Sequence, residues 1–253
     1  MEIRNKTALI TGAAKRVGRA IALALAREGV NIAFTYNTSQ RAAIETKEEL
    51  KKYGIKVTVF QANLCSVNRC EDLIQQVLNR FPKLDILVNN ASCFLKTDIE
   101  ELGRDPVRFE EEFDNLARLH IASPLYLGIQ LGSLMKKNGW GRIINITDRV
   151  VVKGQAYRNW SLYQTTKYGL HGVTQVLAVE LSPEVTVNSI APGLVLPPPD
   201  FTRNQLIGIR KRIPLKKEAS PEEIAKDVLH LIQSDSKTGS TILTDGGVSV
   251  LTC

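Results

Sequence analysis

The sequence predicts an α/β fold with a single doubly wound parallel sheet of about seven strands and helices on both faces. Two observations carry this prediction. Short apolar runs rich in β-branched residues alternate, from one end of the chain to the other, with segments of helical spacing. The connections between them are short, and no Pro/Gly/Ser-rich linker or block of charge divides the 253 residues. We therefore expect one domain over residues 1–253.

The apolar runs are interpreted as strands, in chain order Thr7–Thr11, Val30–Tyr36, Val57–Gln61, Ile86–Asn89, Arg142–Thr147, Thr186–Ile190 and Ser240–Leu243. Helical spacing predicts the helices between them, at Gly18–Glu28, Arg41–Tyr53, Val67–Phe81, Arg108–Lys137, Leu162–Leu181 and Pro221–Gln233. The segment after the sixth strand is the least regular, and it contains Pro197–Pro199 before a polar, basic helix. We expect a substrate lid there, at residues 193–219.

Composition argues against several classes of protein. The formal net charge is +7, but the basic residues occur in short groups beside acidic or apolar neighbours, so nucleic acid is not an expected partner. The four cysteines form no CxxC pair and have no associated histidines, so neither a metal site nor a disulfide framework is suggested. A reducing cytoplasm is the simplest location. No apolar stretch approaches the roughly 20 residues that span a bilayer, so no membrane segment is expected.

A turn of small residues follows the first expected strand and opens a helix, Thr11-Gly12-Ala13-Ala14-Lys15-Arg16-Val17-Gly18. Gly12 allows a sharp bend, and Gly18 lets the helix pack closely while its free N–H groups face a pyrophosphate. The motif alone is weak, because an ordinary strand-to-helix turn is the alternative. Its place on the first strand of an alternating α/β chain favours a dinucleotide held by Gly12, Lys15, Arg16, Val17 and Gly18.

The end of the second strand indicates which dinucleotide is bound. NAD-specific proteins of this kind usually carry an acid there for the ribose hydroxyls, but Tyr36-Asn37-Thr38-Ser39 has none. Hydroxyl and amide groups, with Lys15 or Arg41 nearby, can instead hold a 2′-phosphate, so NADPH is favoured over NADH. A polar turn without a ligand is the alternative. Further cofactor contacts are expected where other strands end, at Asn63, Leu64, Asn90, Ala91, Ser92, Pro192 and Gly193.

Tyr163 and Lys167 lie four residues apart in a helical segment, so their side chains share one face. A phenol is a poor acid at neutral pH, and a nearby ammonium stabilises its phenolate. We therefore expect Lys167 to lower the pKa of Tyr163, so that Tyr163 can donate a proton beside a hydride acceptor. Such a pair is also common on a solvated helix face, and only its context decides.

That context is a set of five motifs, Thr11-Gly12 to Gly18, Asn89-Asn90-Ala91, Tyr163 to Lys167, Ala191-Pro192-Gly193 and Asp245-Gly246-Gly247. In order and spacing these motifs resemble the short-chain dehydrogenase/reductase family over nearly the whole chain. The resemblance implies a single Rossmann-like domain, a catalytic Tyr163 at the cofactor, and a Lys167 that also holds the nicotinamide ribose. It further implies a homotetramer.

Three positions depart from that family's pattern. Arg16 stands at the middle glycine of the turn, where its guanidinium could bind cofactor and substrate together. Asp148 stands at the strand end that usually carries a serine, and the loop from there to Tyr163 is two residues longer. His120, four residues before Pro124, takes the place of the helix asparagine of the usual proton relay. It is either a relay group or a satisfied buried histidine.

These departures resemble the pteridine reductases and the bacterial dihydromonapterin or dihydrofolate reductases of the family. By that resemblance the substrate pocket is lined by Arg16, Ser92, Phe94, Asp148 and Tyr163. A flat heterocycle could stack on Phe94 while its polar edge meets Ser92 and Asp148, and a carboxylate suits a substrate nitrogen that must be protonated. Phe94 could instead be core packing, and Asp148 could cap a turn.

The sequence thus predicts that Asp148, Tyr163 and Lys167 are the catalytic residues of an NADPH-dependent reductase with a small-molecule pterin or folate substrate. Hydride would pass to a C=N carbon of dihydrobiopterin, dihydromonapterin or dihydrofolate, giving the tetrahydro form. One alternative is a carbonyl reductase such as a 3-ketoacyl-carrier-protein reductase, in which the basic stretch Arg210–Lys217 could dock an acidic carrier. Another is a non-catalytic NADP-binding protein that keeps the fold.

Overall fold

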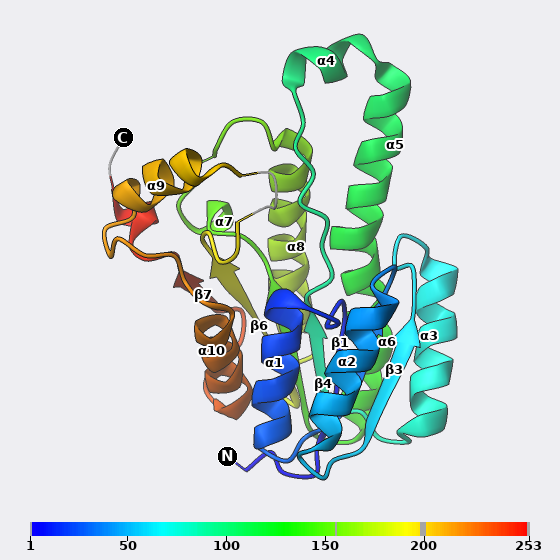
Figure 1. Cartoon of the computed structure of the whole chain (residues 1–253). Coiled ribbons are helices and arrows are strands. Elements are labelled where there is room, and N and C mark those ends of the chain that lie inside the picture. The colour runs from blue at the N-terminus through cyan, green and yellow to red at the C-terminus, as the bar shows by residue number, and fades with distance from the viewer. Residues whose placement is uncertain (1, 155, 198–200, 252–253) are drawn as a thin grey trace.

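Seven parallel strands form one central sheet in the order β3-β2-β1-β4-β5-β6-β7 (Figure 1). The computed structural model describes residues 2–154, 156–197 and 201–251. Each pair of neighbouring strands runs parallel. The chain order reverses between β1 and β4, and ligands of doubly wound sheets bind at the carboxyl ends of strands beside such a reversal. The predicted fold, one doubly wound Rossmann-like sheet, is confirmed.

The strands lie close to their predicted positions. They are β1 (Thr7–Ile10), β2 (Asn31–Tyr36), β3 (Val57–Gln61), β4 (Ile86–Asn89), β5 (Gly141–Ile146), β6 (Val185–Pro192) and β7 (Thr241–Thr244). β6 runs further than predicted, because Ala191 and Pro192 still pair with Leu243 and Thr244 of β7.

Helices cover both faces of the sheet (Figure 1). On one face lie α1 (Arg16–Arg27), α2 (Gln40–Lys51) and α10 (Pro221–Gln233). On the other lie α3 (Val67–Arg80), α6 (Ser123–Lys137) and α8 (Ser161–Glu180). Strand residues alternate between the two cores, so that Ala8 and Ile10 of β1 join the first and Leu9 joins the second. Two apolar layers therefore hold the strand ends, and the residues that follow them, in fixed positions.

Further elements lie near the carboxyl ends of the strands (Figure 1). They are α4 (Ile99–Arg104), α5 (Pro106–Ala117), α7 (Val150–Lys153), α9 (Arg203–Arg212) and the 3-10 turn η2 (Val248–Val250). The sequence did not predict α4 and α7, since helices of six and four residues are too short to show a period. Pro198, Pro199 and Asp200 of the predicted lid lie outside the described residues.

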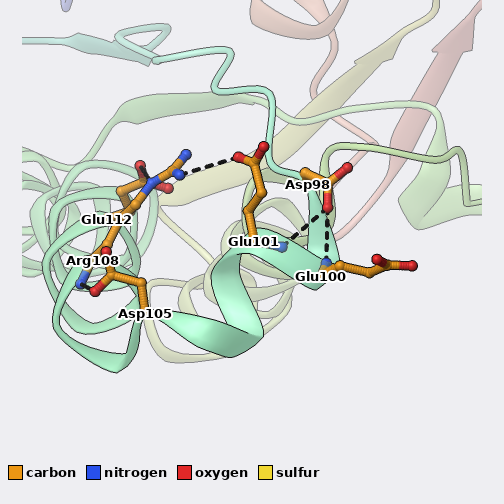
Figure 2. Close-up of polar contacts among 6 residues, drawn as sticks. All are labelled: Asp98, Glu100, Glu101, Asp105, Arg108 and Glu112. Carbon is orange, nitrogen blue, oxygen red and sulfur yellow. Dashed lines mark hydrogen bonds and ion pairs between the residues drawn. The ribbon is translucent and has the colours of Figure 1, made fainter.

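Charged side chains cap α4 and α5 and connect these two helices (Figure 2). The Asp98 carboxylate accepts the backbone N–H of Glu101 at 3.2 Å at the start of α4. Asp105 caps α5 by accepting the N–H of Arg108 at 3.0 Å. The Arg108 guanidinium then donates to Glu112 at 2.8 Å and to Glu101 at 3.4 Å, which joins the two helices. These caps and pairs join residues that are close in sequence, and they connect α4 with α5.

The long helix predicted over Arg108–Lys137 is not regular. It begins at Pro106, whose fixed φ suits a first turn, and a π-helical turn, η1 (Arg118–Ala122), separates α5 from α6. A π turn inserts an extra residue into the helix, and His120 lies in this turn with its side chain fully buried. The periodicity could not show the turn, because the partners of His120 are distant in sequence.

Candidate active site

The three predicted catalytic side chains meet near the carboxyl end of β5. Asp148 follows β5, while Tyr163 and Lys167 lie one turn apart in α8. The Tyr163 hydroxyl donates to Asp148 Oδ2 at 3.4 Å, and Lys167 Nζ donates to the Ile146 carbonyl at 2.8 Å. Lys167 Nζ also lies 5.6 Å from the centre of the Tyr163 ring. A carboxylate, a phenol and an amine therefore share one buried site.

Burial determines the protonation state of Tyr163. The pKa of Tyr163 is raised well above its ordinary value, first by burial and then by the negative charge of Asp148, while a hydrogen bond with Ser92 acts in the opposite direction. In the ligand-free protein the net pKa of Tyr163 is therefore raised, whereas the sequence led us to expect a lowered one. Desolvation of the phenolate is the largest cause. Tyr163 is a protonated phenol, which is the form that a proton donor needs.

Lys167 is only 2% exposed, and its burial lowers its pKa to about 8, while the charge of Asp148 acts in the opposite direction. Below about pH 8 the side chain is consequently an ammonium. An ammonium in this position stabilises the phenolate that remains when the Tyr163 proton leaves. The pair thus has the charges that proton donation requires, although its pKa values follow burial more than the pairing itself.

The two carboxylate oxygens of Asp148 accept hydrogen bonds from different groups. Its Oδ1 accepts the backbone N–H of Val150 at 3.0 Å at the start of α7, so the expectation of a turn cap has a structural basis. Its Oδ2 accepts the hydroxyls of Tyr157 at 2.9 Å and Tyr163 at 3.4 Å. Burial raises the pKa of Asp148, whereas the bonds from Val150 and Tyr157 lower it. One oxygen therefore caps the turn, and the other accepts the hydroxyls of Tyr157 and Tyr163.

His120 is fully buried and connects three elements. The Cys93 N–H donates to its Nε2 at 3.3 Å, which makes Nε2 an acceptor and leaves the proton on Nδ1. Nδ1 then donates to the Thr166 hydroxyl at 2.8 Å, which in turn donates to the Tyr163 carbonyl at 2.9 Å. The Ser92 hydroxyl lies 2.9 Å from Nε2. Burial lowers the pKa of His120 to about 2, so the ring is neutral.

Toward Thr166 this chain of hydrogen bonds ends on a backbone carbonyl, which cannot pass a proton onward. At its other end Ser92 connects His120 to the Tyr163 hydroxyl. Both ring nitrogens of His120 thus have partners, and neither of the two interpretations that the sequence left open is excluded.

Phe94 lies at the mouth of the site and is not a core residue. Its side chain is 44% exposed, its ring meets the Tyr163 ring edge-on at 4.8 Å, and it stacks on Trp160 at 5.0 Å. The indole Nε1 of Trp160 is buried without a hydrogen-bond partner in the described part of the chain. An exposed aromatic ring beside the phenol offers a surface on which a flat ligand can stack.

The turn after β1 has the backbone that a bound phosphate requires. Gly12 has a φ of +65°, and a Cβ there would meet Ala91 Cα at 2.9 Å. A Cβ on Gly18 would meet Asn90 Nδ2 at 2.5 Å, so α1 closely approaches the loop after β4. The Lys15 side chain makes no capping bond to α1, and the N–H groups of its first turn remain available to an anion.

Arg16 has a left-handed backbone of the kind that favours glycine. Its φ is +57°, in the left-handed region that costs a residue with a Cβ about 1–2 kcal/mol. Its guanidinium is exposed and donates to the Leu196 carbonyl at 2.6 Å, within the predicted lid. The chain thus accepts strain at this position and places a cation between the turn and Leu196.

A cavity of about 310 Å³ lies at the carboxyl ends of β2 and β3. It is lined by Asn37, Gln61, Ala62, Asn63, Arg69, Asp72, Leu73 and Gln76. Asn37 and Asn63 were predicted, whereas Arg69, Asp72 and Gln76 of α3 carry no motif and were missed. Asp72 forms an ion pair with Arg69 at 3.5 Å, so the carboxylate in this cavity is compensated. The residues present fit the adenosine half of a dinucleotide.

Other predicted cofactor residues shape the turn or flank it. Asn90 Nδ2 donates to the Thr11 carbonyl at 2.9 Å, and Ala91 N donates to the Thr11 hydroxyl at 3.0 Å. A Cβ on Gly193 would meet Asp245 Cα at 2.8 Å, so the chain after β6 also has no room for a larger residue. Val17, Tyr36 and Ser39 are half-buried, Thr38 is exposed and Leu64 is buried.

Comparison with known proteins agrees with this geometry. The model of the family described as short chain dehydrogenase matches residues 6–205. The chain belongs to the short-chain dehydrogenase family. Its relatives include proteins named 3-oxoacyl-acyl-carrier-protein reductase from Staphylococcus epidermidis, Synechocystis sp. and Aquifex aeolicus, each 32% identical to it. The alignments cover 96–98% of this chain and 96–99% of those relatives.

As a short-chain dehydrogenase, the protein is an oxidoreductase, as the order of its motifs predicted. The names of these relatives match the carbonyl reductase alternative, and none of them is a pteridine reductase. In the part of the chain that the structure describes, no helix is long and apolar enough to cross a membrane. Over the same residues no group of three or more His, Cys, Asp or Glu side chains is arranged to hold a metal ion.

Proposed function

We propose that the protein is an NADPH-dependent reductase that converts a dihydropteridine to its tetrahydro form, with dihydrobiopterin, dihydromonapterin and dihydrofolate as candidate substrates. The observation that carries this proposal is the buried Asp148 carboxylate, whose Oδ2 accepts the Tyr163 hydroxyl. Reduction of a C=N bond places a proton on a ring nitrogen, and a carboxylate favours that proton. Reduction of a ketone instead develops an alkoxide, which a neighbouring carboxylate opposes.

Each side chain of the site has a distinct part in this reaction. NADPH supplies the hydride when it is bound. Tyr163 holds the proton on its hydroxyl, and Lys167 stabilises the phenolate that remains after the proton leaves. Asp148 orients the Tyr163 hydroxyl and attracts the N–H groups of an amino-pyrimidinone edge. Its buried position strengthens the interaction with the substrate, because few waters compete for Oδ2.

The exposed Phe94 ring favours a flat, aromatic substrate. Phe94 leaves a large part of its ring exposed at the edge of Tyr163. A pteridine presents a planar face to such a ring, whereas an acyl thioester is a flexible chain with no face to stack. The Ser92 hydroxyl, which lies 2.9 Å from His120 Nε2 and is hydrogen-bonded to Tyr163, adds a polar group beside the phenol.

The choice of NADPH is supported by the end of β2. Asn37 and Thr38 are exposed there, and no carboxylate stands among residues 36–39 to repel a 2′-phosphate. Lys15 and Arg16 are exposed cations at the neighbouring turn. NADPH and NADH titrations compared at two salt concentrations measure this preference, and equal affinities for both cofactors would contradict it.

Initial rates of NADPH oxidation test the proposed substrate class. The panel contains the three dihydropteridines and an acetoacetyl thioester at matched concentrations. We expect turnover of at least one dihydropteridine and little or none of the thioester. Turnover of the thioester alone would overturn the proposal.

A second candidate is the reduction of a 3-oxoacyl thioester, and the names of the relatives favour it. The basic residues around α9 could dock an acidic carrier protein, although the Arg210 guanidinium is already paired with Glu218 at 2.8 Å. The third possibility, cofactor binding without catalysis, is opposed by the intact arrangement of Tyr163, Lys167 and Asp148. NADPH binding without turnover on a broad panel would support that third possibility.

Assembly and location remain predictions. We propose a homotetramer in the cytoplasm, and exposed apolar side chains on α8, including Val176 at 55% and Val179 at 78%, are available for contacts between copies. Light scattering on the purified protein measures the assembly directly.

A further inference from the structure

Tyr157 lies in the loop between α7 and α8, the loop that is longer than the family pattern. Its hydroxyl donates to Asp148 Oδ2 at 2.9 Å, which is shorter than the 3.4 Å from the Tyr163 hydroxyl to the same oxygen. Two phenols therefore share one carboxylate oxygen. The phenol outside the predicted catalytic group makes the closer contact.

The position of Tyr157 is fixed by Gln164, the neighbour of Tyr163 on α8. Tyr157 N donates to Gln164 Oε1 at 2.9 Å, and Gln164 Nε2 donates back to the Tyr157 carbonyl at 2.7 Å. Gln164 is only 6% exposed, so water competes little with this pair of bonds. The Tyr157 ring also meets Trp160 at 5.8 Å and lies 5.2 Å from the Arg149 guanidinium. The loop thus holds one phenol at a set distance from the helix that carries the other.

We propose that Tyr157 is a positioning residue that acts through Asp148. Its hydroxyl lies closer to Oδ2 than the Tyr163 hydroxyl does and favours the charged form of the buried carboxylate. The Tyr163 hydroxyl is thereby left loosely bound and able to donate to the substrate. The inference rests on the proposed function only in taking Asp148 as a working part of the site.

The charges around Asp148 determine the sign of the expected effect. Burial raises the pKa of Asp148, while the bonds from Val150 and Tyr157 and the cations Lys167 and Arg149 lower it. Removing the Tyr157 hydroxyl removes one of the groups that favour the carboxylate and leaves the others in place. The acid form of Asp148 therefore becomes easier to populate, and Oδ2 becomes free to bind the Tyr163 hydroxyl more closely.

The first measurement is independent of any substrate. Infrared titration follows the protonated carboxylic acid band of Asp148, identified by subtracting the spectrum of Asp148→Asn. In Tyr157→Phe we expect the midpoint to move to higher pH by about one unit, the equivalent of losing one hydrogen bond to a charged group. The matched control is Tyr168→Phe, which removes another phenol from the same region, one that donates to the Val150 carbonyl at 2.8 Å and does not touch Asp148. An equal midpoint in wild type and Tyr157→Phe overturns the proposal.

The second measurement is the pH profile of kcat and KM on whichever substrate the wild type reduces. We expect Tyr157→Phe to lower kcat about tenfold with little change in the KM for NADPH, and to move the acidic limb of the profile to higher pH. Tyr168→Phe should keep the wild-type profile. Loss of activity with an unmoved limb overturns the proposal, because it indicates a merely structural role. If no dihydropteridine is reduced but the infrared midpoint moves, the proposed function fails and the role of Tyr157 stands.

Discussion

Replacing His120 by asparagine is expected to make the stability of the protein less sensitive to acid. His120 is fully buried, and its pKa is lowered from 6.5 to about 2. Below pH 6.5 the unfolded chain takes up a proton at this residue, whereas the folded protein does not until about pH 2. The free energy of unfolding therefore decreases as the pH falls through this range.

The size of this loss in the free energy of unfolding follows from the pH range between the two pKa values of His120. A single proton bound only by the unfolded state changes the free energy of unfolding by about 1.4 kcal/mol per pH unit. Between pH 7.5 and pH 5.0 the wild type is therefore expected to lose about 2 kcal/mol through His120 alone. The raised pKa of Asp148 acts with the opposite sign, but that residue is present in both proteins and cancels in the comparison.

Urea unfolding of wild type and His120→Asn at pH 7.5 and pH 5.0 measures the effect. The change in the free energy of unfolding between the two pH values should be about 2 kcal/mol smaller in the variant. His230→Asn, which alters an exposed histidine of α10, should keep the wild-type dependence. An equal dependence in wild type and His120→Asn would refute the assignment of a neutral buried imidazole.

Three further outcomes are expected. Tyr163→Phe should abolish turnover while NADPH binding, followed by fluorescence, is retained; residual turnover within tenfold of wild type would show that another group donates the proton. Gly18→Ala should weaken NADPH binding and lower the melting temperature, because a Cβ there would meet Asn90 Nδ2 at 2.5 Å; unchanged binding would contradict this tight approach. Turnover should decline as the pH rises above about 8, where Lys167 loses its charge, and a rate that is flat to pH 10 would contradict that assignment.

Much of the fold follows from short-range patterns in the sequence. The central strands are buried on both faces, so runs such as the first three residues of β4 are apolar and their positions are visible. The spacing of Tyr163 and Lys167 on a helix, and the bend at Gly12, are likewise local properties. Each of these could be predicted because neighbours in the chain decide it.

What the sequence could not show depends on contacts between distant residues. His120, in the π-helical turn, forms hydrogen bonds with Cys93 and Thr166, which are distant in sequence. The hydrogen bond from Gln164 to the Tyr157 carbonyl forms only when the loop is folded. The raised net pKa of Tyr163 could not be predicted for the same reason, because burial is its largest cause. A motif shows which groups are near each other, but only the packed structure shows how completely water is excluded from them.

The central claim is that Asp148 suits the site to a C=N substrate, and one variant tests it most directly. Asp148→Ser restores the residue that the family pattern has at this strand end. The measurement is the ratio of kcat/KM for the best dihydropteridine to kcat/KM for an acetoacetyl thioester, in wild type and in Asp148→Ser. We expect this ratio to fall about a hundredfold in the variant, as the loss of a buried hydrogen-bonding charge implies. A ratio that is unchanged, or one that favours the thioester in both proteins, would contradict the claim.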